Sequence, residues 1–224
     1  EILTFDTDKE IWAEKGKLGR GRTQFGLAEH DGDLWIFGGL NYDPARKGNG
    51  AFDHVTSTLV ARRGSTEFVD AGVALPGPRR AFGGVVHDGV YYITGGIRES
   101  FQLVDGCLAF HFADQRFEEI PCPRKNRLSA ELVSLDGRLY VIGGAVKGAD
   151  GKMESERSIE VFDPKTETWA VLLEDVGTDT KHLRAMAYRH RLLLVTTHKE
   201  EARLELTLVA PASDLSATAL ATTR

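Results

Sequence analysis

Short apolar runs separated by polar turns recur along this chain at nearly constant intervals. Three segments read as two short strands around an Asp-Gly turn and end in paired glycines: residues 26–39, 83–96 and 132–144. A weaker copy spans residues 186–197, with Thr196 and Thr197 in place of the glycines. Because Asp-Gly suits a type I′ turn, in which both central residues have positive φ, each segment predicts an antiparallel hairpin of strands a and b.

The spacing of these segments predicts a repeat architecture. The first paired glycine recurs after 57 residues, from Gly38 to Gly95, and after 48 more, at Gly143. The equivalent position in the weaker copy, Thr196, follows after another 53 residues. Outside these hairpins lie polar turns flanked by aromatic residues seven positions apart. The aromatic pairs are Phe5 and Trp12 before the first hairpin, Phe110 and Phe117, and Phe162 and Trp169. We interpret these as strands c and d, with residues 55–61 and 67–71 taking that place in the first full unit. A period near 50 residues is typical of propeller blades.

The combination of motifs resembles kelch repeats. The paired glycines follow an apolar strand, Phe162-Asp163-Pro164 forms a turn, Trp169 lies beyond it, and an Arg precedes strand a. The resemblance extends over essentially the whole chain; it is strongest in residues 127–173 and weakest in the fourth unit, which lacks both the glycines and the Trp. It implies an all-β fold, a kelch-type β-propeller of four-stranded antiparallel blades around a central channel.

The repeat gives a division of residues 1–224 as one propeller domain. Residues 1–17 would supply strands c and d of a partial blade, followed by blades at 18–75, 76–120, 121–176 and 177–224, the last strand at about 215–221. Kelch propellers commonly have about six blades, so we expect a fragment of a larger propeller. The alternative is closure by strands from both ends, residues 2–12 completing the blade begun at 184–198. Open edges would invite self-association.

Composition narrows the class of protein. The 224 residues are 42% hydrophobic and 27% charged with 24 Gly, as in a folded globular chain. A net charge of -5 argues against nucleic-acid or membrane-surface partners, and the lack of an apolar run of about 18 residues predicts a soluble protein, its compartment left open. Cys107 and Cys122 could form one disulfide, but we expect buried free thiols.

Basic residues are concentrated on one predicted face. Meander topology places the d-to-a and b-to-c loops together, and the d-to-a windows 15–22, 76–80, 121–127 and 177–184 contain eleven Lys or Arg against the single acid Asp179. Four arginines precede strand a at closely matching positions, and we expect them to bind carboxylate or phosphate as a ring: Arg22, Arg80, Arg127 and Arg184. Alternatively, each bonds to carbonyls of the neighbouring blade. Rim contacts are expected from Tyr42, Arg98 and Arg157.

These features favour a binding module over an enzyme. The expected partner is an acidic protein or peptide segment, not a nucleic acid or a membrane. We expect no cofactor or metal, because the seven His are scattered and the sequence contains no phosphate-binding loop. It also contains no recognisable nucleophile–base pair. The alternative is a sugar-acid epimerase similar to bacterial kelch-type sialic-acid epimerases. In that reading Glu154, Arg157 or His182 would transfer the proton. We match no residue to a catalytic motif.

Overall fold

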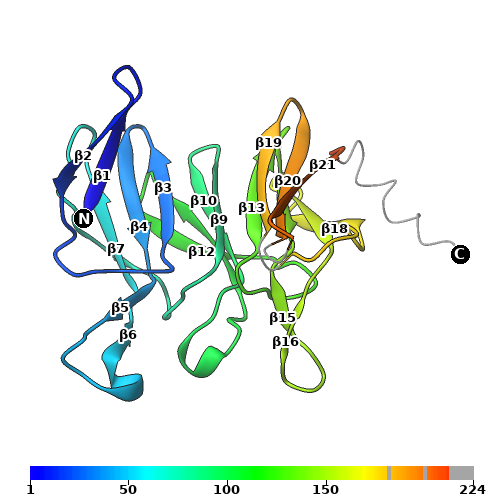
Figure 1. Ribbon diagram of the computed structural model, residues 1–224, viewed down its shortest axis with the longest axis horizontal. Helices are drawn as coiled ribbons and strands as arrows, with labels where there is room; N and C mark the ends of the chain where they lie inside the picture. Colours follow the sequence, from blue (N-terminus) through cyan, green and yellow to red (C-terminus); the bar gives the residue numbers. More distant parts are fainter. Residues whose placement is uncertain (181–182, 199–200, 212–224) are drawn as a thin grey trace, which may run out of the picture. The chain divides into compact units, whose positions relative to one another are not determined.

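A computed structural model describes residues 1–180, 183–198 and 201–211 (Figure 1). Regular structure in these residues is β, apart from two short 3₁₀ turns, so the all-β prediction is confirmed. Within the same residues, no helix combines the length and apolar character that a membrane crossing requires. The chain forms two compact units, Glu1–Arg80 and Ala81–Arg224, which we describe separately as the first and second units.

The first unit contains one complete four-stranded sheet and two hairpins. Its antiparallel sheet has the order β3-β4-β7-β8, formed by Gly26–His30, Asp33–Phe37, Ser57–Ala61 and Val69–Ala74. Among the described residues, the strands β1 (Ile2–Asp6) and β2 (Ile11–Gly16) pair only with each other. Between β4 and β7 the chain forms a further hairpin, β5 (Leu40–Tyr42) and β6 (Phe52–His54), joined through the 3₁₀ turn η1 (Gly48–Ala51).

The second unit contains two complete sheets and a three-stranded one. The sheet β9–β12 is formed by Gly83–His87, Val90–Thr94, Cys107–His111 and Arg116–Ile120, with η2 (Glu99–Phe101) between β10 and β11. The sheet β13-β14-β17-β18 is formed by Glu131–Leu135, Arg138–Ile142, Ile159–Asp163 and Thr168–Leu173. The hairpin β15 (Ala145–Lys147) and β16 (Met153–Ser155) extends from the end of this sheet (Figure 1).

The last sheet contains strands β19 (Leu183–Tyr188), β20 (Arg191–His198) and β21 (Arg203–Val209). The strand expected at about 215–221 lies outside the described residues. Without the paired glycines, β20 continues through Thr196 and Thr197 and pairs with β21 as far as His198 and Arg203. The sheets match the expected four-stranded antiparallel blades, the first and last of them with fewer strands in the described residues.

The Asp-Gly turns have the backbone conformation that the sequence predicts. Asp31 and Gly32 have φ of 52° and 85°, and positive φ recurs at residues 88–89 and 136–137. In the last sheet, Arg189 and His190 adopt the same conformation without a glycine, with φ of 46° and 58°. The type I′ geometry therefore persists where the residue preference is lost.

In the second unit the sheets pack face to face. Tyr92 of β10 contacts Phe162 of β17, with ring centroids 6.2 Å apart, and Val85 packs against the same apolar cluster. On its other face, the sheet β13-β14-β17-β18 buries Tyr140 against Leu192 of β20. Interlocking of apolar faces between successive sheets is how propeller blades form a continuous core.

The two cysteines form a disulfide, so the expectation of free thiols is wrong. Cys107 begins β11 and pairs with Ile120, the last residue of β12, and Cys122 follows two residues later. The Cα atoms lie 5.3 Å apart, within the usual range for a bridge. The bridge joins strand c of this sheet to the segment that leads into the next.

Reduction of the disulfide is expected to lower the free energy of unfolding of the second unit by about 3 kcal/mol, because the bridge closes a loop of fifteen residues in the unfolded chain. Urea unfolding with and without dithiothreitol, followed by circular dichroism, measures this effect. The double variant Cys107→Ser, Cys122→Ser should unfold at one urea concentration under both conditions. An unchanged urea midpoint of the wild-type protein in the presence of dithiothreitol would contradict the expectation.

Candidate binding site

The paired glycines determine the backbone at the loop end of each sheet. Gly95 and Gly96 have φ of 63° and 93°, values that favour glycine, and both other pairs lie in the same region. The N–H of Gly96 donates to the carbonyl of Arg127 at 2.7 Å, and a Cβ at Gly95 would overlap that carbonyl oxygen. The glycines thus end strand b, turn the chain outward and admit the segment that precedes the next sheet.

Two of the predicted arginines hold this loop end together from within. Arg22 donates from Nη1 to the carbonyls of Gly38 and Ser57 at 3.2 and 3.0 Å, and from Nη2 to the Ser57 hydroxyl at 2.8 Å. Arg127 makes the same three contacts with Gly143 and Ser158. These carbonyls belong to the arginine's own sheet, not to a neighbouring one. The guanidinium thus provides hydrogen-bond donors to backbone carbonyls at the point where strands b and c separate.

Arg127 is also paired with a buried acid. Its side chain is 1% exposed, and Nη2 contacts Oε1 of Glu160, whose Oε2 accepts from the backbone N–H of Arg124 at 2.7 Å. Burial lowers the pKa of Arg127, and the charges of Glu160 and Glu156 oppose that shift. The donors of this guanidinium are therefore largely occupied inside the protein.

The structure corrects the register of the repeated arginine. The position sixteen residues before the first paired glycine is Arg22, Arg79, Arg127 and Thr180 in turn. The carbonyl of Arg79 accepts from Gly39 as that of Arg127 accepts from Gly96. The matching residue is thus Arg79, whose burial lowers its pKa to about 10, rather than Arg80.

Thr180 occupies this position in the last repeat, where the sequence suggested Arg184. A Cβ at Gly143 would lie 2.7 Å from Cβ of Thr180, as one at Gly95 would meet Arg127. Arg80 is buried and donates to Oε1 of Gln24. Arg184 lies in β19 with a largely exposed side chain and donates to Oε1 of Glu131 at 2.7 Å.

The expected rim residues are all exposed. Tyr42 lies in β5, with its ring 5.3 Å from that of Phe52 on the paired strand. Arg157 forms an ion pair with Asp175 at 2.8 Å. Arg98, just before η2, donates from Nε to Oε1 of Gln102 at 3.2 Å. Whether they contact a ligand stays a prediction.

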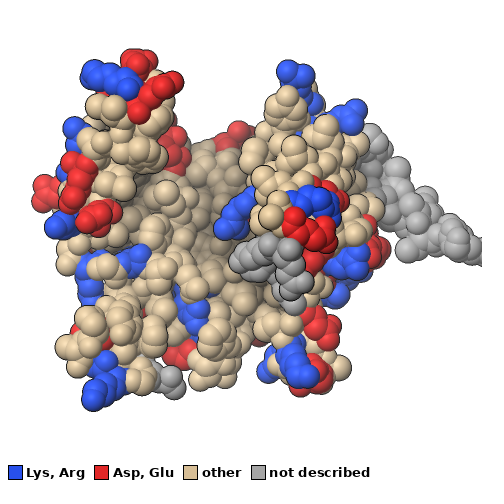
Figure 2. Space-filling view, in the orientation of Figure 1, with Lys and Arg blue, Asp and Glu red and all other residues tan. Residues whose placement is uncertain are grey.

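Acids from other segments neutralise much of the basic charge in the d-to-a windows. Arg20 pairs with Asp53, and Arg124 pairs with Glu174 through two hydrogen bonds of 2.9 and 2.8 Å. Further pairs join Lys17 to Glu14, Lys125 to Glu156, Arg127 to Glu160 and Arg184 to Glu131. On the face seen in Figure 2, basic and acidic side chains accordingly lie side by side in several places. Counts within the windows alone therefore overstate their positive charge.

Glu156 shows how strongly this pairing acts. Its burial raises the pKa, but hydrogen bonds from Lys125 and Ser158 and the charge of Arg127 together lower the pKa to about 2. Nζ of Lys125 lies 2.7 Å from Oε2 of Glu156, and the backbone N–H of Ser158 donates to Oε1 at 3.0 Å. The carboxylate thus anchors Lys125 at the loop end of the second unit.

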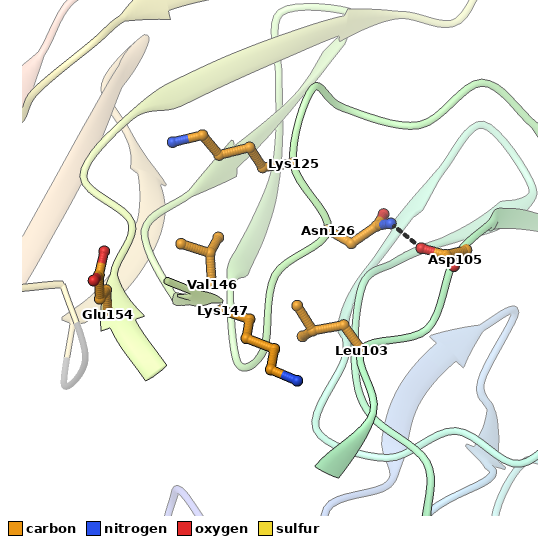
Figure 3. A pocket seen from close by; sticks show the side chains of 7 residues that line it. All are labelled: Leu103, Asp105, Lys125, Asn126, Val146, Lys147 and Glu154. Atoms are coloured by element: carbon orange, nitrogen blue, oxygen red, sulfur yellow. Dashed lines mark hydrogen bonds between the residues drawn. The ribbon is translucent and has the colours of Figure 1, made fainter. Parts of the chain in front are cut away.

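A groove of about 440 Å³ lies beside this anchor in the second unit (Figure 3). Three segments line it: the b-to-c segment before β11, the segment before β13, and the hairpin β15–β16. The lining residues are Leu103, Asp105, Lys125, Asn126, Val146, Lys147 and Glu154. Asn126 donates to Oδ1 of Asp105 at 2.7 Å, which links two of the segments (Figure 3). The groove thus combines loops of the predicted face.

Lys147 is the cation in this groove that the fold leaves available. It is exposed at the end of β15, and within residues 1–180, 183–198 and 201–211 no acid lies within ion-pair distance of it. In Figure 3 its side chain and that of Leu103 lie near each other, with Glu154 on the other side of Val146. The groove therefore has an apolar part, one available ammonium group and two carboxylates, those of Glu154 and of Asp105, which accepts from Asn126.

The residues of the epimerase alternative do not all fall in this groove. Glu154 lines it, Arg157 is paired with Asp175, and His182 lies outside the described residues. Across the described ranges, no group of three His, Cys, Asp or Glu side chains could hold a metal ion. Sequence reasoning missed Lys125, Asn126 and Lys147 as a set, although Gly148 and Gly151 between two short apolar segments signal the hairpin that presents Lys147.

Comparisons with known proteins agree with this geometry. The family model described as Kelch motif matches residues 126–172. An F-box/kelch-repeat protein of Arabidopsis thaliana is 30% identical over 97 residues, covering 43% of this chain and 23% of the relative. Kelch-like protein 41a of Danio rerio is 27% identical over 143 residues, covering 64% of this chain and 22% of the relative. The chain thus spans less than a quarter of the length of these relatives.

A solved structure shares the fold. The structure of YjhT superposes with a TM-score of 0.69 at 17% identity, covering 86% of this chain and 64% of that chain. The matched motif contains Arg127 and the glycine pair 143–144, which order the loop end of the sheet, and Phe162 and Trp169, which pack in the apolar cluster with Tyr92. Sequence, sheets and comparisons agree on one conclusion: residues 126–172 contain a kelch motif, and the chain is similar to kelch-repeat proteins.

Proposed function

We propose that this chain is a protein-interaction module that binds an acidic segment of a partner at its d-to-a and b-to-c loop face. The observation that carries the proposal is the groove around Lys147, where three loops of that face meet and one ammonium group remains available. The kelch motif at residues 126–172 and the similarity to Kelch-like proteins support a role as an interaction scaffold.

The groove favours a mixed acidic and apolar segment. Leu103 and Val146 offer apolar contact area, and Lys147 would pair with a carboxylate placed beside the apolar residue of the partner. The negative charge of Glu154 would repel a second carboxylate of the partner placed next to it. Outside the groove, Tyr42, Arg98 and Arg157 remain our candidates for rim contacts. Arg184 remains a candidate for an anion contact, and both Arg157 and Arg184 would first have to leave their present acids.

We expect Lys147→Glu to weaken binding of an acidic peptide about tenfold, a change of about 1.4 kcal/mol. The probes are fluorescent peptides of equal length that contain one Leu flanked by Glu, Gln or Lys, measured by fluorescence anisotropy. The wild-type protein should prefer the Glu peptide. Glu154→Gln should tighten its binding, because a like charge is removed.

Lys152→Glu is the matched control. Lys152 lies on the same hairpin, is largely exposed and pairs with Asp150, but does not line the groove. Its charge reversal should change affinity less than twofold. Equal binding of the three wild-type peptides, or equal losses for Lys147→Glu and Lys152→Glu, would sink the groove as the site.

Self-association is the second part of the proposal. Large apolar side chains are exposed on two sheets, with Trp12 at 67% and Leu206 at 66% relative exposure. Apolar faces of this kind mark interaction surfaces in folded proteins. We therefore expect copies of the chain to associate with one another in addition to binding a partner.

A further inference from the structure

The sheet β19-β20-β21 has one covered and one exposed face. Leu192 and Leu194 point to one face of the sheet and are buried against the preceding sheet. The residues that point to the opposite face include large apolar side chains that are exposed. We call the second side the outer face. Its most exposed apolar residues are Met186, Tyr188, Leu204, Leu206 and Leu208, at 44–66% relative exposure.

Equivalent faces of the two preceding sheets are covered. Met186 and Leu193 are cross-strand partners, with Leu193 three residues before Thr196. The matching pairs are Val85–Tyr92 and Val133–Tyr140, each with its Tyr three residues before the first paired glycine. Tyr92 contacts Phe162 of the next sheet, and Tyr140 is fully buried with Leu192 of the next sheet. Each covered face thus receives apolar residues from the following sheet.

The first unit exposes residues of the type that covers such a face. Phe5 and Trp12 are cross-strand partners with ring centroids 5.1 Å apart, as Phe162 and Trp169 are at 5.0 Å. Phe162 is 1% exposed because it packs against the sheet containing Tyr92, whereas Phe5 is 44% and Trp12 67% exposed. We call this side, with Leu3, Phe5 and Trp12, the β1–β2 face.

We propose that the outer face of one copy packs against the β1–β2 face of a second copy. The contact would repeat, between molecules, the junction seen between the sheets of Tyr92 and Phe162 within the second unit. The bordering charges are opposite in sign. Exposed Arg191 lies opposite Tyr188 on the outer face, and Glu14, which also pairs with Lys17 at 3.9 Å, lies opposite Leu3 on the β1–β2 face. This inference rests on the proposed self-association and specifies it as heterologous, with two different surfaces in each contact.

Complementation between two variants tests the proposal. Leu206→Asp should prevent packing through the outer face, and Trp12→Asp should prevent packing through the β1–β2 face. Both substitutions are at exposed positions. In sedimentation velocity, wild-type protein should form dimers or larger assemblies, and each variant alone should be a monomer. A mixture should restore a dimer, because Leu206→Asp retains the β1–β2 face and Trp12→Asp retains the outer face.

Other results would overturn it. If the Leu206→Asp protein alone still dimerises, the β1–β2 face pairs with itself and the contact is not heterologous; the same holds for the outer face and Trp12→Asp. If wild-type protein is monomeric at every concentration, self-association itself fails. Leu206→Gln and Trp12→Gln, with melting curves, detect a loss of folding. Phe101→Asp, at an exposed residue on neither face, should leave the assembly unchanged.

Discussion

Arg127→Met should lower the free energy of unfolding by about 4 kcal/mol, because it leaves an acid without its partner inside the protein. Glu160 is 1% exposed and would retain only the backbone N–H of Arg124 as a described donor. The carbonyls of Gly143 and Ser158 would also lose the donor they share. Urea unfolding of the second unit measures the loss.

Two comparisons separate the buried pair from a general effect of charge removal. Arg184→Met removes an exposed arginine paired with Glu131 and should cost less than about 1 kcal/mol. Adding Glu160→Gln to Arg127→Met should recover part of the stability, since the uncompensated charge disappears. Equal losses for Arg127→Met and Arg184→Met would show that the buried contacts do not stabilise the fold.

Gly95→Ala should destabilise the second unit by about 4 kcal/mol through two separate costs. Positive φ costs an alanine about 1–2 kcal/mol. The added Cβ would also overlap the carbonyl oxygen of Arg127, and relieving such overlap moves backbone that the Gly96–Arg127 hydrogen bond holds in place. Thermal and urea unfolding both measure the change.

Gly137→Ala isolates the backbone cost. Gly137 has φ of 77°, close to the 63° of Gly95, but its Cβ would meet no atom within 4 Å. We expect a loss of about 1–2 kcal/mol there. If both alanine variants lose the same stability, the close contact between Gly95 and the carbonyl of Arg127 is not the reason that this position requires glycine.

The fold was predictable because its signals are local. Asp88-Gly89 fixes a turn by its own conformational preference, and the glycine pairs 38–39, 95–96 and 143–144 each end an apolar strand. The seven-residue step from Phe110 to Phe117 also sets the register of β11 on β12. That register places Cys122 next to Cys107, so a signal for the disulfide was present in the sequence.

The electrostatic environment was not predictable in the same way. Arg20 and Arg127 meet acids 33 residues away, and Arg124 meets Glu174 across 50 residues. These pairs form only once the sheets have formed. The repeated Arg79 could be found by strict spacing from Gly95, but its neighbour Arg80 fits a loose alignment equally well. Charge counted along segments cannot show which side chains remain unpaired.

The glycine pair has a consequence for how such a sheet can vary. Where Gly143 and Gly144 interrupt the ladder, the hairpin β15–β16 leaves the sheet and brings Lys147 to the groove. Where Thr196 and Thr197 stand instead, β20 runs unbroken to His198 beside β21. Two residues therefore decide whether a repeat contributes only to the scaffold or also carries an exchangeable segment, and new recognition segments can be grafted after Gly39, Gly96 or Gly144.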